Sequence, residues 1–131
     1  MITIGFCGMS HLGLCYSTAA AKKGFKVVCF DYNKNKIKKL KNFQIEIDEP
    51  KLKELIIKNK NNIIYTEKIA KLSSCDFVYF SYDVSTDNRG KSDKTTLTKN
   101  LDTLIINMER RSPLIILSQV PPGFTKNYYK I

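Results

Sequence analysis

Short, mainly apolar runs alternate with amphipathic segments along the chain, and this alternation predicts its elements. The apolar runs predict β-strands at residues 2–7, 26–31, 63–65, 76–81 and 114–118. Helical spacing, or a proline suited to a first turn, predicts helices at residues 11–23, 33–41, 50–58 and 94–110, with a helical turn at 67–72. Loops are expected at residues 82–93 and 121–123, and residues 126–131 resemble the start of another helix.

Strands that read as continuous apolar runs are typical of parallel sheets, because such strands are buried on both faces. A helical segment follows almost every predicted strand, so βαβ units with right-handed crossovers are expected. The predicted fold class is therefore α/β, with an open, doubly wound, mostly parallel sheet and helices on both faces. A length of 131 residues suits one domain and is too short for two.

The clearest local motif follows the first predicted strand. Residues 8–13 read GMSHLG, one substitution from the G-x-G-x-x-G pattern that joins a strand to a helix in dinucleotide-binding domains. A competing frame that starts at Gly5 would place Cys7 and Ser10 at glycine positions and would divide the strand. The frame that starts at Gly8 follows the strand and opens the helix, which is the context the motif requires.

Each position of this glycine turn, residues 8–13, has a physical role. Gly8 permits the tight turn, and Gly13 allows the helix to pack closely on the sheet. The middle position lets the backbone approach a pyrophosphate at the helix N-terminus. Ser10 occupies that position, and its small hydroxyl side chain can cap the helix or donate to phosphate, although the substitution equally allows a weakened site.

Asp31 ends the second predicted strand, 18 residues after Gly13. A carboxylate there accepts hydrogen bonds from the adenosine ribose and repels a 2′-phosphate, which favours NAD over NADP. The alternative is a strand-end aspartate that caps the following helix. Lys34 and Lys36 lie beside it in sequence, so NADP stays possible. The turn, its flanking elements and the spaced acid are together typical of a Rossmann-type domain, although methyltransferases share parts of the pattern.

The chain is strongly basic, with 22 Lys and Arg against 12 Asp and Glu and a net charge of +10. Three of the 22 are Arg (Arg89, Arg110 and Arg111), whereas base and phosphate recognition relies on the bidentate guanidinium. The lysines are spread along the chain without a nucleic-acid-binding motif. We therefore expect solvated helix faces and no nucleic-acid partner.

The cysteines give no sign of a metal site. Cys7, Cys15, Cys29 and Cys75 lack the paired spacing of zinc ligands, so reduced, mostly buried side chains and no metal are expected. No apolar run approaches the roughly 18 residues of a membrane span. The chain enters a strand at once, without the features of a signal peptide, so we expect no membrane association and a cytoplasmic location.

Five segments, in order and over nearly all of the chain, resemble one enzyme family. They are IGFCGMSHLGL at 4–14, VVCFDYNKNKI at 27–37, IDEPKL at 47–52, VSTDNRGKSD at 84–93 and LSQVPPGFT at 117–125. The sequence resembles the nucleotide-sugar dehydrogenases, the UDP-glucose/GDP-mannose 6-dehydrogenase family. The IDEPKL segment discriminates best, because generic Rossmann domains lack it.

The resemblance implies NAD as the cofactor and names the residues that hold it. The residues expected to wrap the pyrophosphate are Gly8, Ser10, His11, Leu12 and Gly13. Asp31 and Lys36 would hold the adenosine ribose. The residues expected to lie along the cofactor toward its nicotinamide are Val84, Ser85 and Thr86. His11 takes the place of a family tyrosine, so it would either pack on the dinucleotide or be a helix residue without a ligand.

The resemblance also implies that residues 1–131 are the NAD-binding Rossmann domain of a larger enzyme. The family oxidises a sugar-nucleotide C6 alcohol to a carboxylate through a catalytic cysteine, and that cysteine, the central helix and the substrate domain are absent from these residues. We therefore expect no turnover from residues 1–131 alone, a UDP- or GDP-sugar as partner, and a homo-oligomeric full-length enzyme. A stand-alone dinucleotide-binding module without catalysis is the alternative.

Three positions depart from the family pattern. Ser85 replaces a loop proline, and Val84 replaces a threonine that can form a hydrogen bond. Gln119 stands where a family threonine helps to position catalytic water, and it is the one catalytic candidate within this chain.

Overall fold

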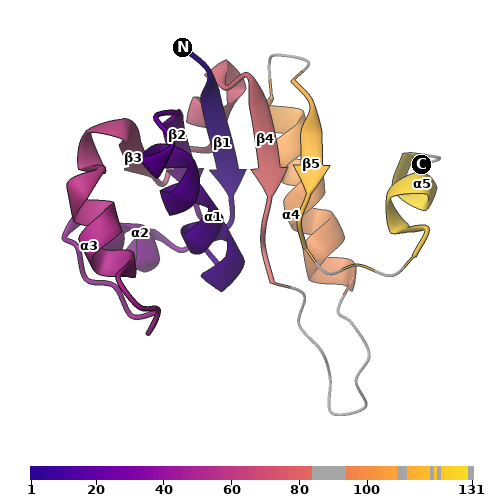
Figure 1. The fold of residues 1–131 in the computed structure, drawn as a ribbon. Helices are drawn as coiled ribbons and strands as arrows, with labels where there is room; N and C mark the ends of the chain where they lie inside the picture. The colour runs from indigo at the N-terminus through magenta and orange to yellow at the C-terminus, as the bar shows by residue number, and fades with distance from the viewer. Residues whose placement is uncertain (84–93, 109–111, 119, 121, 130–131) are drawn as a thin grey trace.

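The computed structural model describes residues 1–83, 94–108, 112–118, 120 and 122–129. Its strands form one sheet in the order β3-β2-β1-β4-β5, and every neighbouring pair is parallel (Figure 1). The strands are β1 (Thr3–Cys7), β2 (Lys26–Phe30), β3 (Ile63–Thr66), β4 (Phe77–Phe80) and β5 (Leu114–Ile116). The predicted strands and the doubly wound parallel sheet are confirmed.

Helical segments connect the strands. The α-helices are α1 (His11–Lys22), α2 (Lys34–Lys41), α3 (Leu52–Lys58), α4 (Lys94–Asn107) and α5 (Phe124–Tyr129), and the 3-10 helices are η1 (Lys60–Asn62) and η2 (Ile69–Ser74). Within the described residues, none of these helices has the length and apolar character needed to cross a membrane.

Three predicted helix starts are displaced: the helical turn expected at 67–72 is η2 at Ile69–Ser74, the helix expected from residue 126 begins at Phe124, and the helix expected from residue 50 begins later. The proline of the IDEPKL segment was expected to open a helix at residue 50, but Pro50 and Lys51 form a turn and α3 begins at Leu52. Lys51 has a φ of 64°, in the left-handed region that a right-handed helix cannot include. The turn closes with a hydrogen bond from the backbone N–H of Leu52 to the carbonyl of Glu49, 3.2 Å long.

Two hydrophobic clusters cover the two faces of the sheet. Side chains from α1, α2 and α3 pack on one face, where β1 contributes Ile4 and Phe6. Side chains from α4 and η2 pack on the other face, together with the buried Cys7, Cys75 and Val78. Figure 1 shows α1 and α4 on opposite sides of the sheet. Because alternate side chains of each strand point to opposite faces, burial on both sides explains the continuous apolar runs.

The sheet places three functional candidates at one edge. The last residue of β1 pairs with the last residue of β2 on one side and with the last residue of β4 on the other. Gly8, Asp31 and Ser81 follow these strand ends directly, so they lie side by side at the carboxyl edge. The helices after β1 and β4 pack on opposite faces, and doubly wound sheets bind ligands at such a switch point.

Candidate functional site

Gly8 is the tightest point of the glycine turn. Its φ is 114°, a backbone conformation that side chains other than hydrogen rarely adopt. A Cβ at this position would lie 2.7 Å from the backbone nitrogen of Tyr82 and 2.8 Å from its Cγ. The backbone N–H of Gly8 also donates to the carbonyl of Phe30, 2.8 Å away. The predicted requirement for glycine therefore has a steric cause.

Gly13 brings the first turn of α1 against the end of the sheet. A Cβ at Gly13 would lie 2.1 Å from the carbonyl oxygen of Gly8 and 2.7 Å from Oγ of Ser81. The close packing expected at this position is present, and its partners are the residues that follow β1 and β4 rather than the strands themselves.

Ser10 is the N-cap of α1. Its Oγ accepts a hydrogen bond from the backbone N–H of Gly13 (3.1 Å) and donates one to the carbonyl of Ser81 (2.5 Å). The side chain is buried, and the cap is one of the two roles the sequence allowed. A phosphate contact stays a prediction, and it requires the hydroxyl to turn away from Ser81.

Ser81 is a site residue that sequence reasoning missed. Its Oγ donates to the carbonyl of Gly8 over 2.7 Å, and the residue is 1% exposed. Ser81 thus fixes the glycine turn from the end of β4. The available signal was a small polar residue directly after a buried apolar run.

Asp31 holds the glycine turn from the end of β2. Its Oδ2 accepts the backbone N–H of Met9 (2.7 Å) and its Oδ1 accepts the backbone N–H of Asn33 (2.8 Å). The residue is 4% exposed. The cap of α2 is Asn33, whose side chain accepts the N–H of Lys36, so the alternative that Asp31 caps this helix is wrong.

Lys36 reaches back from α2 to the same peptide segment. Its Nζ donates to the carbonyl of Met9 over 3.2 Å. Met9 is therefore held by a carboxylate at its N–H and by an ammonium at its carbonyl. The structure brings the predicted Asp31 and Lys36 together on this residue of the glycine turn.

A cavity of about 230 Å³ opens beside the glycine turn. It is lined by residues of the turn (Met9, Ser10 and His11), by Lys36 of α2, and by Asp83 after β4, among others. Leu12 is half-buried and, among the described residues, lies outside this lining. Three residues predicted to hold NAD, namely Ser10, His11 and Lys36, thus border one hollow.

Two tyrosines, Tyr32 and Tyr82, lie near the carboxyl ends of β2 and β4, and sequence reasoning missed both. The rings of Tyr32 and Tyr82 stack with centroids 5.6 Å apart and an interplanar angle of 18°. The backbone N–H of Tyr32 donates to the Tyr82 hydroxyl over 2.9 Å. Burial raises the pKa of both phenols, that of Tyr32 to about 12. Aromatic residues just after Asp31 and Ser81 were the available signal.

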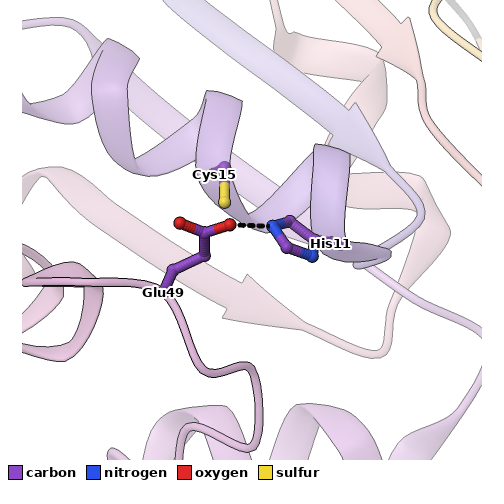
Figure 2. A group of neighbouring side chains, drawn as sticks. All are labelled: His11, Cys15 and Glu49. Carbon is purple, nitrogen blue, oxygen red and sulfur yellow. Dashed lines mark hydrogen bonds and ion pairs between the residues drawn. The ribbon is translucent and has the colours of Figure 1, made fainter.

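His11 points away from the hydrogen-bonded turn toward the IDEPKL segment. Its Nε2 lies 2.6 Å from Oε1 of Glu49 (Figure 2). His11 is exposed and Glu49 is half-buried. The segment that best discriminated the family in the sequence thus contacts the glycine turn directly. Packing of His11 on a dinucleotide stays a prediction.

Four of the predicted site residues lie outside the described residues. They are Val84, Ser85, Thr86 and Gln119.

The parallel sheet, the glycine turn after β1 and the acidic residue after β2 together define a Rossmann-type dinucleotide-binding domain. The chain belongs to the UDP-glucose/GDP-mannose dehydrogenase family, because the model of that family's NAD-binding domain matches residues 2–131. The predicted family and the predicted cofactor, NAD, are confirmed by this match.

Two curated relatives are named as dehydrogenases, and each is much longer than this chain. UDP-glucose 6-dehydrogenase TuaD of Bacillus subtilis is 30% identical over 129 residues, which cover 96% of this chain and 28% of that protein. UDP-N-acetyl-D-mannosamine dehydrogenase of Methanocaldococcus jannaschii is 27% identical over 125 residues, which cover 94% of this chain and 29% of that protein. The chain therefore spans less than a third of the length of these relatives.

Solved structures share the fold. A UDP-D-ManNAc dehydrogenase from Pyrococcus horikoshii superposes with a TM-score of 0.89 at 22% identity, covering 98% of this chain and 31% of that one. GDP-mannose dehydrogenase from Pseudomonas aeruginosa, solved as a ternary complex, gives a TM-score of 0.82 at 20% identity, covering 95% and 30%. The sheet and its helices thus match the corresponding part of nucleotide-sugar dehydrogenases.

Proposed function

We propose that residues 1–131 form one NAD-binding domain that serves a nucleotide-sugar dehydrogenase. The full-length protein would oxidise the C6 alcohol of a UDP- or GDP-sugar to a carboxylate. The observation that carries this proposal is the glycine turn at the switch point of the sheet, held from both sides at Met9 by Asp31 and Lys36. NAD supplies a hydride acceptor when it is bound.

The glycine turn fits the pyrophosphate. Gly8 and Gly13 let the turn pack against Tyr82, the Gly8 carbonyl and Ser81 at distances that a Cβ would not allow, so the tight strand–turn–helix geometry that a pyrophosphate requires is kept. The first turn of α1 carries no acidic residue, so its backbone N–H groups and helix dipole favour an anion. The Lys36 ammonium, at the carbonyl of Met9, adds positive charge at the same place.

Asp31 supports the preference for NAD over NADP. Each of its carboxylate oxygens already accepts one backbone N–H, and each retains a lone pair for a ribose hydroxyl. Because the two N–H bonds fix the carboxylate, Asp31 is held rigid where a 2′-phosphate would have to lie. Repulsion between the two anions would disfavour NADP.

Titration of the chain with NAD⁺ and NADP⁺ in a calorimeter tests this proposal. We expect saturable binding of NAD⁺ and at least tenfold weaker binding of NADP⁺, a difference of about 1.4 kcal/mol. Absence of binding at millimolar NAD⁺, or tighter binding of NADP⁺, contradicts the proposal. The roles of Gln119 and of Val84 to Thr86, the homo-oligomer and the cytoplasmic location stay predictions for the full-length enzyme.

A further inference from the structure

Three side chains with metal-ligating atoms meet on one side of α1. His11 and Cys15 are four residues apart, so they lie one helical turn above each other on the same face. Glu49, in the segment before α3, reaches the same place, and Figure 2 shows the three side chains pointing toward one another. One nitrogen, one sulfur and one oxygen of the group all lie within 4.8 Å of one another.

These distances suit a small tetrahedral ion. Zinc bonds of 2.0 to 2.3 Å place neighbouring ligand atoms about 3.4 to 3.6 Å apart. His11 Nε2 and Glu49 Oε1, now 2.6 Å apart, need only separate by less than about 1 Å, while the sulfur moves closer. The His11 side chain is exposed, and Cys15 and Glu49 are half-buried, so all three have room for this adjustment.

The mixture of donors selects the kind of cation. Imidazole and thiolate ligands suit Zn²⁺, whereas Mg²⁺ and Ca²⁺ take oxygen ligands. We propose that His11, Cys15 and Glu49 form a Zn²⁺ site with three protein ligands and an open fourth position. The assignment differs from the sequence expectation of no metal and gives His11 a role that does not require NAD.

Electrostatics explains how the thiol would take part. Burial and the nearby Glu49 carboxylate raise the pKa of the Cys15 thiol. A divalent cation offsets the carboxylate and stabilises the thiolate, and the thiol proton is released to solvent as the metal–sulfur bond forms. The bound ion would join α1 to the segment before α3, beside the glycine turn.

Cobalt spectroscopy and zinc titration test the site directly. The metal-stripped chain is titrated with Co²⁺, and with Zn²⁺ in competition with a chromogenic chelator. We expect one equivalent of each metal and a thiolate-to-cobalt charge-transfer band. Cys15→Ser should abolish that band, and it should weaken Zn²⁺ binding roughly tenfold or more, since loss of even an outer partner costs that much in other sites. Unchanged Zn²⁺ affinity in this variant overturns the proposal.

Thiol labelling gives a second readout. Cys7, Cys29 and Cys75 are 0% exposed, whereas Cys15 is half-buried, so a thiol reagent added to the folded chain reacts first at Cys15. Stoichiometric Zn²⁺ should slow this reaction at least tenfold, and Mg²⁺ at the same concentration should leave it unchanged. Equal rates with and without Zn²⁺ contradict a metal–sulfur bond.

Variants of the other two ligands complete the test. Glu49→Gln and His11→Ala should each lower Zn²⁺ affinity, while Glu46→Gln is the matched control. Glu46 is an exposed glutamate of the same segment, paired with Lys39, and its loss should leave Zn²⁺ binding unchanged. Equal losses in Glu46→Gln and Glu49→Gln would indicate general attraction of cations and overturn the site. Circular dichroism of each metal-free variant confirms that it is folded.

Discussion

The two ends of β1 are closed by the same kind of contact but serve different purposes. At the amino end, Asp76 accepts the backbone N–H of Thr3 over 2.8 Å. At the carboxyl end, Asp31 accepts the backbone N–H of Met9 over 2.7 Å. Asp76 directly precedes β4 and Asp31 directly follows β2, the two strands that neighbour β1, and each aspartate ties its strand to β1. Only the carboxyl end carries the glycine turn and the N-terminus of α1.

The difference shows what turns a structural contact into a binding site. Asp76 is half-buried beside an ordinary strand start, where its hydrogen bond satisfies a backbone donor. Asp31 acts on a residue whose backbone runs between two glycines with contacts that admit no side chain. The same carboxylate chemistry therefore meets the glycine turn and the N-terminus of α1 only at Asp31, which is why the proposed ligand-binding role falls there.

The largest loss of stability is expected at Gly13, whose backbone packs directly against the backbone of Gly8. Gly13→Ala places a Cβ 2.1 Å from the carbonyl oxygen of Gly8, and neither the helix nor the turn can move without breaking the hydrogen bonds of Ser10 and Ser81. We expect a loss of about 3 kcal/mol of stability or more, as for severe overpacking, and no measurable NAD⁺ binding. Urea unfolding followed by circular dichroism measures the loss of stability.

Gly24→Ala is the control substitution for Gly13→Ala, because Gly24 lies before β2, at the amino end of the sheet. Gly24 has a φ of 100°, but a Cβ there has no atom within 4 Å, so only backbone strain of about 1–2 kcal/mol is expected. NAD⁺ affinity of the folded variant should equal that of the wild type. If both alanine variants lose the same stability, close packing at Gly13 is not the cause.

Substitutions of Asp31 and Asp76, the aspartates at the two ends of β1, are expected to give the next largest loss of stability. Asp31→Asn and Asp76→Asn each replace a carboxylate that accepts a backbone N–H, so each should cost about 1.5–3 kcal/mol of stability. NAD⁺ binding should weaken by about 1–2 kcal/mol in Asp31→Asn only, and the preference over NADP⁺ should narrow. Calorimetric titration of both variants with both dinucleotides checks this. Equal NAD⁺ affinities in the two variants would leave Asp31 with a purely structural role.

Local patterns in the sequence were sufficient to predict the sheet and the turn. The central strands β1 and β2 are buried on both faces, so each reads as an apolar run whatever its neighbours are. Gly8 and Gly13 were identified because the close approaches they permit occur within one strand–turn–helix unit. The buried cysteines followed from their place in those runs.

Contacts between distant segments could not be predicted in this way. The hydrogen bond from Met9 to Asp31 joins residues 22 apart, and the pair of His11 and Glu49 joins residues 38 apart. The start of α3 was misplaced because the left-handed φ of Lys51 has no signature in residue type. Each of these features depends on how elements meet in space, which spacing along the chain does not specify.

A substitution of Lys36, which donates to the carbonyl of Met9, is expected to have a smaller effect on NAD⁺ affinity. Lys36→Met removes the ammonium that donates to the Met9 carbonyl and keeps a side chain of similar length. NAD⁺ affinity should fall about fivefold, close to 1 kcal/mol, and the loss should shrink as salt is added. Lys38→Met, an exposed lysine of the same helix, should change NAD⁺ affinity much less. Equal losses would mean that overall positive charge, rather than the contact with Met9, attracts the dinucleotide.

The smallest expected effect is on the pH dependence of stability and comes from Tyr32, which follows Asp31 at the carboxyl end of β2. Burial raises the pKa of Tyr32 to about 12, whereas the phenol of an unfolded chain ionises near 10. Between these values the folded protein binds more protons than the unfolded chain, so this contribution to stability falls as pH rises from 10 to 12 and is complete below pH 10. Because Tyr32 is 37% exposed, solvent screening keeps the slope shallow.

Tyr32→Phe should remove that alkaline slope. At neutral pH it loses the hydrogen bond from the Tyr32 hydroxyl to the carbonyl of Asn100, worth about 0.5–1.5 kcal/mol. Tyr16→Phe, on the exposed face of α1, should keep the wild-type slope, because ionisation of the other tyrosines and the lysines is common to both variants. Urea midpoints measured at several pH values between 9 and 12 distinguish them. Identical slopes in the two variants would show that burial does not shift the Tyr32 phenol.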